Sequence, residues 1–505
     1  MKVKNLNAES QRRKVFIDKF SYKQNLSKLI FFTLCLCGLA VNSFSQSETP
    51  PVPTAPRAAK IPSVIETTLP NGLRVVVVER KNVPLISAIL LVKSGANVEG
   101  DKAGLANMTA SLLEKGTKTR TATQIAEQME FLGANLNTGA GWNSSSVSVN
   151  VTSDKINQAM AIMSDAILNP TFSQAEIDLL KSQTLDELNV ALKQPSTLAN
   201  FVASRYTFGE HLASGTPESL AKLTRTDILG FQRENYLPAN SVLIFTGDIT
   251  QIQAKQLTSK YFGVWKSPIK VKGIRVNGFE ESSSKNIIAR LLVIDLPNSG
   301  QAAVNYAKKL NSGRLGNQYF SSSVANAILG GGYSARLNYE IRIKRGLSYG
   351  AGSSFAWRYG ESNFSTRAQT KTVSAAQVAE LTLAELDKLG SEVAPNDELT
   401  ARKLALTGDF GRDLASNNDL LARIVELYTF DLKPAELNSY IQSVNNVSDK
   451  SVRDFAGVNL KGGDLIIVGD YKDFADDLKA RFPNQKIEVI KASELDLNSN
   501  TLRKK

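Results

Sequence analysis

The sequence predicts a duplicated domain of strands and helices, because three of its segments recur at one constant spacing. The first is an apolar helix pattern at residues 154–168, the second is the start of the next helix, and the third is an apolar strand that ends in Gly-Asp. The matched positions are Ala159 with Leu381, Glu176 with Glu398, and Gly247 with Gly469. Each pair is 222 residues apart, and a shared register at three places indicates an internal repeat.

Length, composition and charge agree with an ordinary globular protein of more than one core. The chain has 505 residues, of which 42% are hydrophobic. Its formal net charge is +12, but eight basic and two acidic residues lie in the first 45 positions. The remaining charges are mixed and form no basic run, so we expect no nucleic-acid partner.

Residues 1–45 have the features of a signal peptide. Basic residues precede an apolar run of 13 residues from Leu29 to Val41, which is short for a membrane span. Ser43 and Ser45 supply the small side chains that precede a cleavage site before Gln46. We therefore expect an exported protein, either periplasmic or in the cell envelope. An uncleaved leader that anchors the chain to a membrane is the alternative.

Both cysteines, Cys35 and Cys37, lie inside the apolar run of the leader. After cleavage the mature chain would contain no cysteine, which excludes thiol catalysis, structural disulfides and cysteine ligands for zinc. The chain also has a single histidine, His211. Catalysis by a serine triad, which needs a histidine base, is therefore not expected either.

Composition also indicates the domain boundaries. Residues 46–60 form a proline-rich, extended linker that precedes the folded sequence. The junction between the two repeats falls in residues 266–286, which are rich in Gly, Ser and charge. We therefore expect an N-terminal domain at 61–265 and a C-terminal domain at 287–490. Residues 491–505 are polar and predict a frayed tail.

Local patterns assign several elements of the N-terminal domain. Residues 70–72, Pro-Asn-Gly, predict a turn before two strands rich in β-branched residues, 73–79 and 85–93. Thr121 predicts a helix N-cap with a capping box, and Gly133 predicts the end of that helix. Strands and helices are therefore mixed within one repeat.

The glycine-rich segment at 330–332 predicts a loop, followed by a short helix, a sharp stop and a strand. Three glycines permit positive φ values and the close approach of another segment. Ser334 stands where a helix N-cap is expected, and Gly346 where a glycine ends a helix. Glu340 and Lys344 are spaced for an ion pair across one helical turn.

These residues, together with landmarks in the first half, resemble the pitrilysin, insulinase and mitochondrial processing peptidase family of zinc peptidases. The landmarks are Gly104-Leu105-Ala106, Lys115-Gly116-Thr117, Leu132-Gly133-Ala134-Asn135-Leu136-Asn137, Gly215-Thr216-Pro217-Glu218 and the two Gly-Asp strand ends. The resemblance covers residues 61–490. It implies an α+β, metalloprotease-like fold of two homologous domains, each a mostly antiparallel sheet with helices packed on one face.

The resemblance also shows which catalytic groups this chain lacks. Active family members carry His-x-x-Glu-His on a helix between the Gly-Leu-Ala and Lys-Gly-Thr landmarks, where the histidines bind Zn²⁺ and the glutamate activates water. The degenerate positions in this chain are Asn107, Ala110 and Ser111. Glu187 lies in the region and sequence context of the family's third zinc ligand, and it is the one remnant of the ligand set that we expect.

The single histidine, His211, does not restore a metal site. A catalytic zinc site generally uses three protein ligands, so one histidine is insufficient. The resemblance places His211 in a structural connection before the Gly-x-Pro-Glu landmark. We therefore expect no metal and no cofactor in this chain, and zinc in a partner chain.

The resemblance implies that the C-terminal half holds substrate. In the family, a glycine loop and an arginine–tyrosine pair help to hold a peptide over a zinc site built elsewhere. The corresponding residues in this chain are Gly330, Gly331, Gly332, Arg345 and Tyr349. An arginine and a tyrosine can both donate hydrogen bonds to a carbonyl oxygen that gains negative charge.

The sequence thus favours an exported, non-catalytic subunit of a heterodimeric zinc metallopeptidase that is inactive alone. The expected partner is a homologous zinc-binding peptidase subunit, and the expected substrates are peptides. The segment around Asn137 adds an edge strand with which an extended peptide could pair. Two alternatives stay open. One is an inactive peptidase-fold binding or scaffold protein with no peptidase partner, and the other is a peptidase that acts alone through an unrecognised site.

Overall fold

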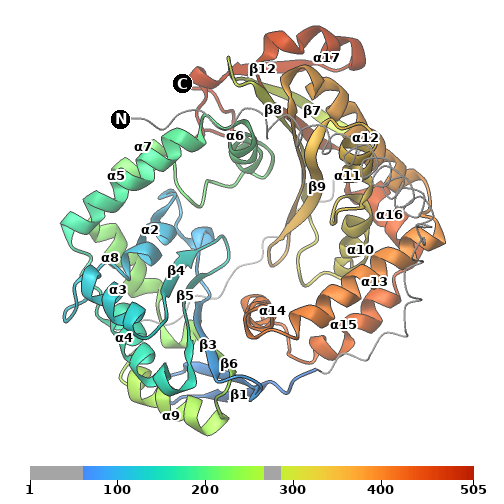
Figure 1. Cartoon of the computed structure of the whole chain (residues 1–505). Coiled ribbons are helices and arrows are strands. Elements are labelled where there is room, and N and C mark those ends of the chain that lie inside the picture. The colour runs from blue at the N-terminus through green and yellow to red at the C-terminus, as the bar shows by residue number, and fades with distance from the viewer. Residues whose placement is uncertain (1–60, 267–285, 505) are drawn as a thin grey trace, which may run out of the picture. The chain divides into compact units, whose positions relative to one another are not determined.

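Each half of the chain folds into a six-stranded sheet with helices packed against it (Figure 1). The structure is a computed structural model that describes residues 61–266 and 286–504. The expected signal peptide, the expected linker at 46–60 and nearly all of the expected linker at 266–286 lie outside the described residues. The domain boundaries drawn from those segments stay predictions.

The N-terminal sheet has the strand order β1-β2-β6-β3-β5-β4. Its strands are β1 (Ile65–Thr68), β2 (Arg74–Glu79), β3 (Leu85–Val92), β4 (Leu136–Ala140), β5 (Ser145–Thr152) and β6 (Ser241–Gly247). β2 and β6 are parallel, and the other pairings are antiparallel. All seven residues of β6 are buried, which explains the continuous apolar run from Val242 to Phe245 within it.

The C-terminal sheet repeats this topology in the order β12-β7-β11-β8-β10-β9. Its strands are β7 (Ile288–Asp295), β8 (Gln301–Leu310), β9 (Ser348–Trp357), β10 (Ser362–Lys371), β11 (Gly463–Gly469) and β12 (Ile487–Lys491). By strand order, β7 to β11 take the places of β2 to β6. The sheets differ at one edge, where β1 is antiparallel to β2 but β12 is parallel to β7. The predicted duplicated α+β fold is confirmed.

The helices of the two halves also follow one another in the same order along the chain. Those of the N-terminal half are α2 (Leu105–Leu112), α3 (Ala122–Phe131), α4 (Ile156–Leu168), α5 (Gln174–Ala191), α6 (Pro195–Val202), α7 (Pro217–Lys222), α8 (Arg225–Asn235) and α9 (Gln251–Phe262). Those of the C-terminal half are α10 (Tyr319–Leu329), α11 (Arg336–Asn338), α12 (Ala375–Ser391), α13 (Asn396–Asp413), α14 (Asn417–Thr429), α15 (Glu436–Asn445), α16 (Asp449–Asn459) and α17 (Ala475–Arg481). The capping box at Thr121 and the positive φ of Gly133 (+65°) confirm the predicted ends of α3.

The second face of each sheet packs against a helix from the other half. Leu198 of α6 shares an apolar cluster with Ile466 of β11, and Leu420 of α14 shares one with Ile244 of β6. The first residues of α6 and α14 are 222 positions apart, so the two repeats exchange equivalent helices. This exchange buries apolar surface between the halves, and Ala59–Lys505 accordingly form one compact unit.

The C-terminal tail is packed rather than frayed, contrary to the prediction for residues 491–505. Leu497 is 7% exposed and Leu502 is fully buried, and both belong to the apolar cluster that contains α6. The N–H of Asp496 donates to the carbonyl oxygen of Leu502 at 2.9 Å, which closes the tail into a turn. Burial of the two leucine side chains stabilises the tail despite its polar composition, because the turn brings both leucines to one apolar surface.

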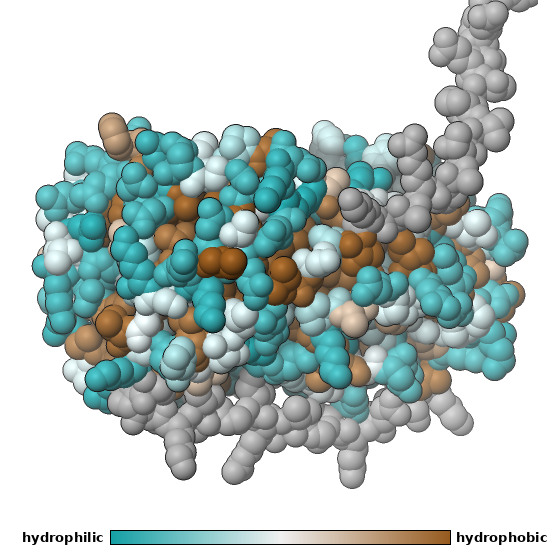
Figure 2. All heavy atoms as spheres, turned by 90° about the horizontal axis from the view of Figure 1, so that it is seen from below, coloured by the Kyte–Doolittle hydropathy of each residue, from teal (hydrophilic) through white to brown (hydrophobic). Residues whose placement is uncertain are grey.

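No helix within the described ranges is both long and apolar enough to cross a membrane. Figure 2 shows one face of the molecule, where hydrophilic side chains lie among smaller groups of hydrophobic ones. Hydrophobic side chains interrupted in this way are normal on a protein surface.

Candidate functional site

Helix α2 carries the positions that a zinc-binding helix would use. Asn107 and Ser111 are half-buried, and Ala110 is fully buried. An amide, a hydroxyl and a methyl group do not supply the imidazole nitrogens and the carboxylate base of the active motif. The residues at these positions therefore do not fit a catalytic zinc ion.

The N-terminus of α2 is closed by the carboxylate of Glu99. Its Oε1 accepts a hydrogen bond from the N–H of Gly104 at 2.8 Å, and its Oε2 accepts one from the N–H of Ala106 at 2.7 Å. The first N–H groups of a helix have no partner within the helix, so this contact caps α2. Nε2 of His211 lies 2.8 Å from Glu99 Oε1, and the His211 ring lies 5.0 Å from that of Trp142. The single histidine thus belongs to a structural cap.

The possible remnant ligand, Glu187, is exposed on α5. Across residues 61–266 and 286–504, no group of three or more His, Cys, Asp or Glu side chains is arranged to hold a metal ion. The expectation that this chain binds no metal stays a prediction.

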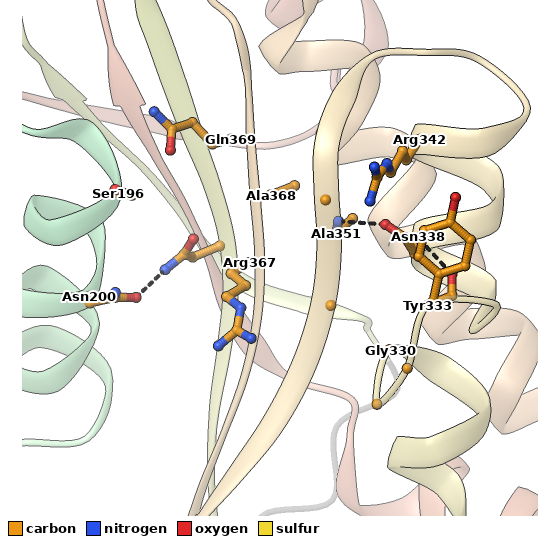
Figure 3. Close-up of a pocket in the computed structure, with 15 residues that line it drawn as sticks. Ser196, Asn200, Gly330, Tyr333, Asn338, Arg342, Ala351, Arg367, Ala368 and Gln369 are labelled. Carbon is orange, nitrogen blue, oxygen red and sulfur yellow. Dashed lines mark hydrogen bonds between the residues drawn. The ribbon is translucent and has the colours of Figure 1, made fainter. Parts of the chain in front are cut away.

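A cavity of about 460 Å³ lies beside the glycine loop (Figure 3). Its walls come from the glycine loop and the helical segment after it, from β8, β9 and β10, and from α6. Because α6 belongs to the first repeat, both halves of the chain build the cavity. The lining residues are Ser196, Asn200, Asn305, Gly330, Gly331, Gly332, Tyr333, Asn338, Arg342, Gly350, Ala351, Gly352, Arg367, Ala368 and Gln369.

Gly330 fixes the glycine loop against β9. Its carbonyl oxygen accepts a hydrogen bond from the N–H of Ser353 at 3.1 Å. A Cβ at Gly330 would lie 2.3 Å from the Ser353 nitrogen, so a side chain cannot fit there without movement. Asn326 at the end of α10 supports the contact, because its Oδ1 accepts a hydrogen bond from the Ser353 hydroxyl at 2.8 Å. Glycine at 330 is therefore required by close approach.

Asn338 is a second link between the helical segment and β9. This side chain is 4% exposed. Its Nδ2 donates to the carbonyl oxygen of Tyr333 at 2.6 Å, and its Oδ1 accepts from the N–H of Ala351 at 3.2 Å. The loop is thus anchored to the edge strand at two points, with the cavity beside them.

The short helix predicted after the glycine loop is present but irregular. α11 spans three residues and continues as a π-helix at Tyr339–Ile343, a rare element that is frequent at functional sites. The predicted N-cap at Ser334 is wrong, because the cap residue is Ala335. The Ser334 hydroxyl instead accepts a hydrogen bond from Nη1 of Arg402 at 2.8 Å, so the long arginine side chain takes the place of the helix amide.

The predicted end of this helical segment is confirmed. Nζ of Lys344 lies 3.1 Å from Oε1 of Glu340, and Gly346 has a φ of +63°. Burial alone would raise the pKa of Glu340, but hydrogen bonds from Arg345 and Lys344 outweigh burial and lower that pKa. The carboxylate of Glu340 therefore stays charged between two cations.

Arg345 and Tyr349 flank the cavity in the sequence but do not line it. Nη1 of Arg345 forms an ion pair with the Glu340 carboxylate and donates to the Glu340 carbonyl oxygen at 3.0 Å. Tyr349 is 91% exposed at the start of β9. Asn137 is exposed on the edge strand β4 of the other sheet, opposite Ser148 of β5. Of the predicted substrate-binding residues, the cavity brings together only the three glycines.

Two models of one protein family match the chain. The model described as Insulinase (Peptidase family M16) matches residues 74–216. The model described as Peptidase M16 inactive domain matches residues 222–406. Together they cover more than half of the chain. The chain belongs to peptidase family M16.

Related proteins share moderate identity with this chain. It is 28% identical over 304 residues to an uncharacterized zinc protease of Mycobacterium leprae, a match that covers 58% of this chain and 66% of that protein. It is 23% identical over 395 residues to the uncharacterized zinc protease YmxG of Bacillus subtilis, covering 77% of this chain and 94% of that protein. The match thus spans about two thirds of the length of the M. leprae relative.

Solved structures show the same M16 fold. A peptidase M16 inactive domain from Pseudomonas fluorescens aligns with a TM-score of 0.73 at 23% identity, covering 81% of this chain and 98% of that chain. The periplasmic protease PqqL of Escherichia coli aligns with a TM-score of 0.65 at 17% identity, covering 86% of this chain and 52% of that chain. This chain is therefore an M16-type, peptidase-like protein with the duplicated fold of the family.

The sequence analysis did not identify Arg342, Asn338 or Arg367 as site residues. Arg342 lies three residues before Arg345, so a search of the glycine segment for further arginines would have found it together with Arg336. No local sequence pattern marks Arg367 as a site residue. Only the pairing of β10 with β9, which sets Arg367 opposite Gly352, brings this residue to the cavity of the M16 chain.

Proposed function

We propose that this M16 chain is an exported, non-catalytic subunit that holds peptide substrates for a homologous chain carrying zinc. The observation that carries the proposal is a contrast between two regions of the chain. The helix α2 has Asn107, Ala110 and Ser111 where a zinc peptidase needs two histidines and a glutamate. The glycine loop of the other half, in contrast, is anchored to β9 and borders a cavity.

The position of Arg345 suits a donor to substrate. A guanidinium has five N–H donors in a planar fork, and the contacts with Glu340 use Nη1. Nε and Nη2 are therefore left for a peptide carbonyl oxygen, while Glu340 holds the fork in orientation. Tyr349 is exposed enough for its hydroxyl to meet a peptide brought by another chain. Donors to a developing oxyanion contribute roughly 2.7–4 kcal/mol each in other enzymes.

The likeness to PqqL supports a partner of the same fold. This chain covers 52% of the PqqL chain and 100% of its first half, so PqqL has room for a second unit of similar size. We propose that in the present case the second unit is a separate chain, which carries the zinc. Asn137 on the edge strand β4 then offers backbone pairing to an extended peptide.

The leader supports export of this subunit. A basic segment, a 13-residue apolar run and two small residues before Gln46 are typical of a cleaved signal. Mass spectrometry of the native protein should find an N-terminus near Gln46. An intact Met1 in the membrane fraction would show that the leader is an anchor.

The test of the proposed function uses the native complex, purified with whatever homologous chain binds this one. In that complex, Tyr349→Phe removes one hydroxyl and should lower peptide turnover roughly ten- to a hundredfold, and Arg345→Ala should lower it at least as much. Zinc content and assembly should not change, because neither residue is a metal ligand.

Two control variants match these changes. Tyr339→Phe removes a hydroxyl from a half-exposed tyrosine of the same segment, and Lys344→Ala removes the other cation that binds Glu340. Both should leave turnover near that of the wild type. Unchanged turnover in Tyr349→Phe and Arg345→Ala complexes would contradict the proposal. If no zinc-bearing peptidase co-purifies with the chain, the alternative of a scaffold protein is favoured.

A further inference from the structure

We propose that a second cavity, located where α14 meets β3 and β5, binds a neutral saccharide through the side chains of Asn150 and Asn418. This asparagine cavity has a volume of about 450 Å³, which is in the range of small-ligand sites. Among the described residues, it shares no lining residue with the cavity beside the glycine loop. The inference goes beyond the proposed function, because it concerns a ligand that this chain binds alone.

Three polar side chains from three elements lie together in the asparagine cavity. Ser87 of β3 stands directly opposite Asn150 of β5, and opposite residues on paired strands project from the same face of a sheet. The Ser87 hydroxyl donates a hydrogen bond to Oδ1 of Asn418 at 2.8 Å. Asn418 lies in the first turn of α14, and this helix lies beside the N-terminal sheet (Figure 1). Both asparagines therefore flank one serine, within reach of one ligand.

Both asparagines have free hydrogen-bonding groups. Within residues 61–266 and 286–504, the Asn150 side chain forms no hydrogen bond, and Nδ2 of Asn418 has no acceptor. A side-chain amide presents one acceptor oxygen and two N–H donors. Adjacent hydroxyl groups of a sugar ring are also both donors and acceptors, so one amide can bond to two of them. Two neighbouring amides can thus hold a sugar ring at several of its hydroxyls.

The fold does not require this polar cluster. Thr246 pairs with Ser87, and the residue 222 positions after Thr246, Val468, pairs with Ala303. The serine that orients Asn418 is therefore an alanine in the other repeat. Because an alanine is compatible with the same sheet, folding alone does not explain the serine and the amide that it orients.

The asparagine cavity offers no free charge to a ligand. Among the described residues, its lining contains no aspartate, glutamate or lysine, and its one arginine is Arg80. Nη1 of Arg80 donates to the carbonyl oxygen of Leu414 at 2.8 Å, and Nη2 donates to that of Ala415 at 2.8 Å. These carbonyls lie at the C-terminal end of α13, where a cation is favoured. Because Arg80 is engaged there, a neutral ligand suits the cavity better than an acidic or a basic one.

Apolar side chains complete the lining. Leu85 is 46% exposed and lies two residues before Ser87, on the same face of β3. Val83 is 48% exposed and lines the cavity as well. The C–H groups on one face of a sugar ring can pack against these two side chains while the hydroxyls contact the asparagines. A saccharide therefore matches both the polar and the apolar part of the lining.

The sheet favours a saccharide over a peptide at this place. β3 pairs with β5 and β6, and β5 pairs with β3 and β4, so neither strand is at an edge. Their backbone groups are paired within the sheet, and a peptide cannot add a strand here. Recognition must come from side chains, which here are mainly amides, hydroxyls and short apolar groups.

The test is isothermal titration calorimetry of the mature chain alone with small probes. The neutral probes are glucose, N-acetylglucosamine and maltose. Glucuronic acid and glucosamine are their charged counterparts, and a short peptide of Gly, Asn and Gly with both ends capped represents a neutral peptide. We expect at least one neutral saccharide to bind about tenfold more tightly than either charged sugar and than the peptide.

Variants locate the site. Asn150→Ala and Asn418→Ala each remove one amide and should weaken saccharide binding about fivefold or more, and the double variant should abolish it. Both residues are exposed, so the variants should fold, which circular dichroism checks. The matched control is Asn189→Ala, because Asn189 is an exposed asparagine of α5 outside the cavity lining. That control should bind saccharide as the wild type does.

Several results would overturn the inference. These are no binding of any neutral saccharide, tightest binding of a charged sugar or of the peptide, binding that survives in the double variant, or an equal loss in Asn189→Ala. Turnover of the native complex with Arg345→Ala is measured separately and does not involve the asparagine cavity. A failure here with a clear Arg345 effect there would leave the proposed function standing.

Discussion

The two halves of this M16 chain use equivalent stretches of the repeat in opposite ways. Between β3 and β4, the N-terminal half closes α2 with the buried Glu99, which also contacts His211. In the C-terminal half, the segment between β8 and β9 borders a cavity lined by Arg342 of that segment and Arg367 of β10, and neither arginine forms an ion pair within the described residues. The two halves thus share a strand order, but their side chains differ. In the first half they close the end of a helix, and in the second half they leave a cavity.

The comparison extends to the helices that follow the sheets. Asp165 of α4 is 8% exposed, whereas Asp387, at the equivalent position of α12, has a side chain that is 55% exposed. At this position the first half therefore buries a carboxylate that it satisfies internally, and the second half keeps the equivalent carboxylate on the surface. Variants in both halves test this difference in burial.

The largest expected effect is that of Glu99→Ala. The variant leaves two helix N–H groups and His211 without their acceptor in a buried place, so we expect a loss of about 3 kcal/mol in the free energy of unfolding. Urea denaturation followed by circular dichroism measures it. Glu127→Ala on the exposed face of α3 should change stability by less than about 0.5 kcal/mol. Equal effects of the two variants would show that Glu99 is not a structural cap.

Asp165→Asn should have the next largest effect, about 2 kcal/mol at neutral pH. Burial alone would raise the pKa of Asp165, but hydrogen bonds from surrounding donors lower it below its ordinary value of 3.8. Because the folded-state pKa is lowered, the stabilisation is present above that ordinary value and is lost as the pH falls through the folded-state pKa. The donors are Thr117, Thr119, Arg120 and Asn169.

The pH dependence and a matched variant check this prediction. The difference in unfolding free energy between wild type and Asp165→Asn should be constant near neutral pH and should shrink below about pH 4. Asp387→Asn should cause little change at any pH, because Asp387 is half-exposed beside Lys461. A pH-independent Asp165 effect would contradict the assignment of the stabilisation to the charged carboxylate.

Gly330→Ala should have the smallest of the three effects on stability, about 1.5 kcal/mol. The new methyl group would lie 2.3 Å from the Ser353 nitrogen, so the loop must move away from β9 and lose a hydrogen bond. Gly332→Ala is the control, because a Cβ there meets nothing within 4 Å. Thermal unfolding measures both, and we expect Gly332→Ala to be nearly neutral. Equal melting temperatures for the two variants would show that the loop is not anchored at Gly330.

Local chemistry explains what could be predicted from the sequence. The capping box at Thr121, the glycine end at Gly133 and the ion pair of Glu340 with Lys344 depend on residues a few positions apart. The duplication was predictable because the apolar positions of equivalent helices recur 222 residues later in the sequence. The N-cap at Ser334 was mispredicted because Arg402, 68 residues away, takes its hydroxyl. Contacts across such distances leave no local pattern.

By itself the sequence determined the duplicated fold, because positions such as Gly247 and Gly469 match 222 residues apart. It also determined, through the resemblance to the family, that Asn107 and Ala110 stand where the zinc motif is expected. Only the tertiary structure decided that α6 completes the cavity, that Arg367 lies opposite Gly352, and that Leu502 is buried. The physical reason is that strand register and helix exchange join residues more than a hundred positions apart or on separate strands. Their contacts depend on the packing of the whole chain, which no short stretch of sequence specifies.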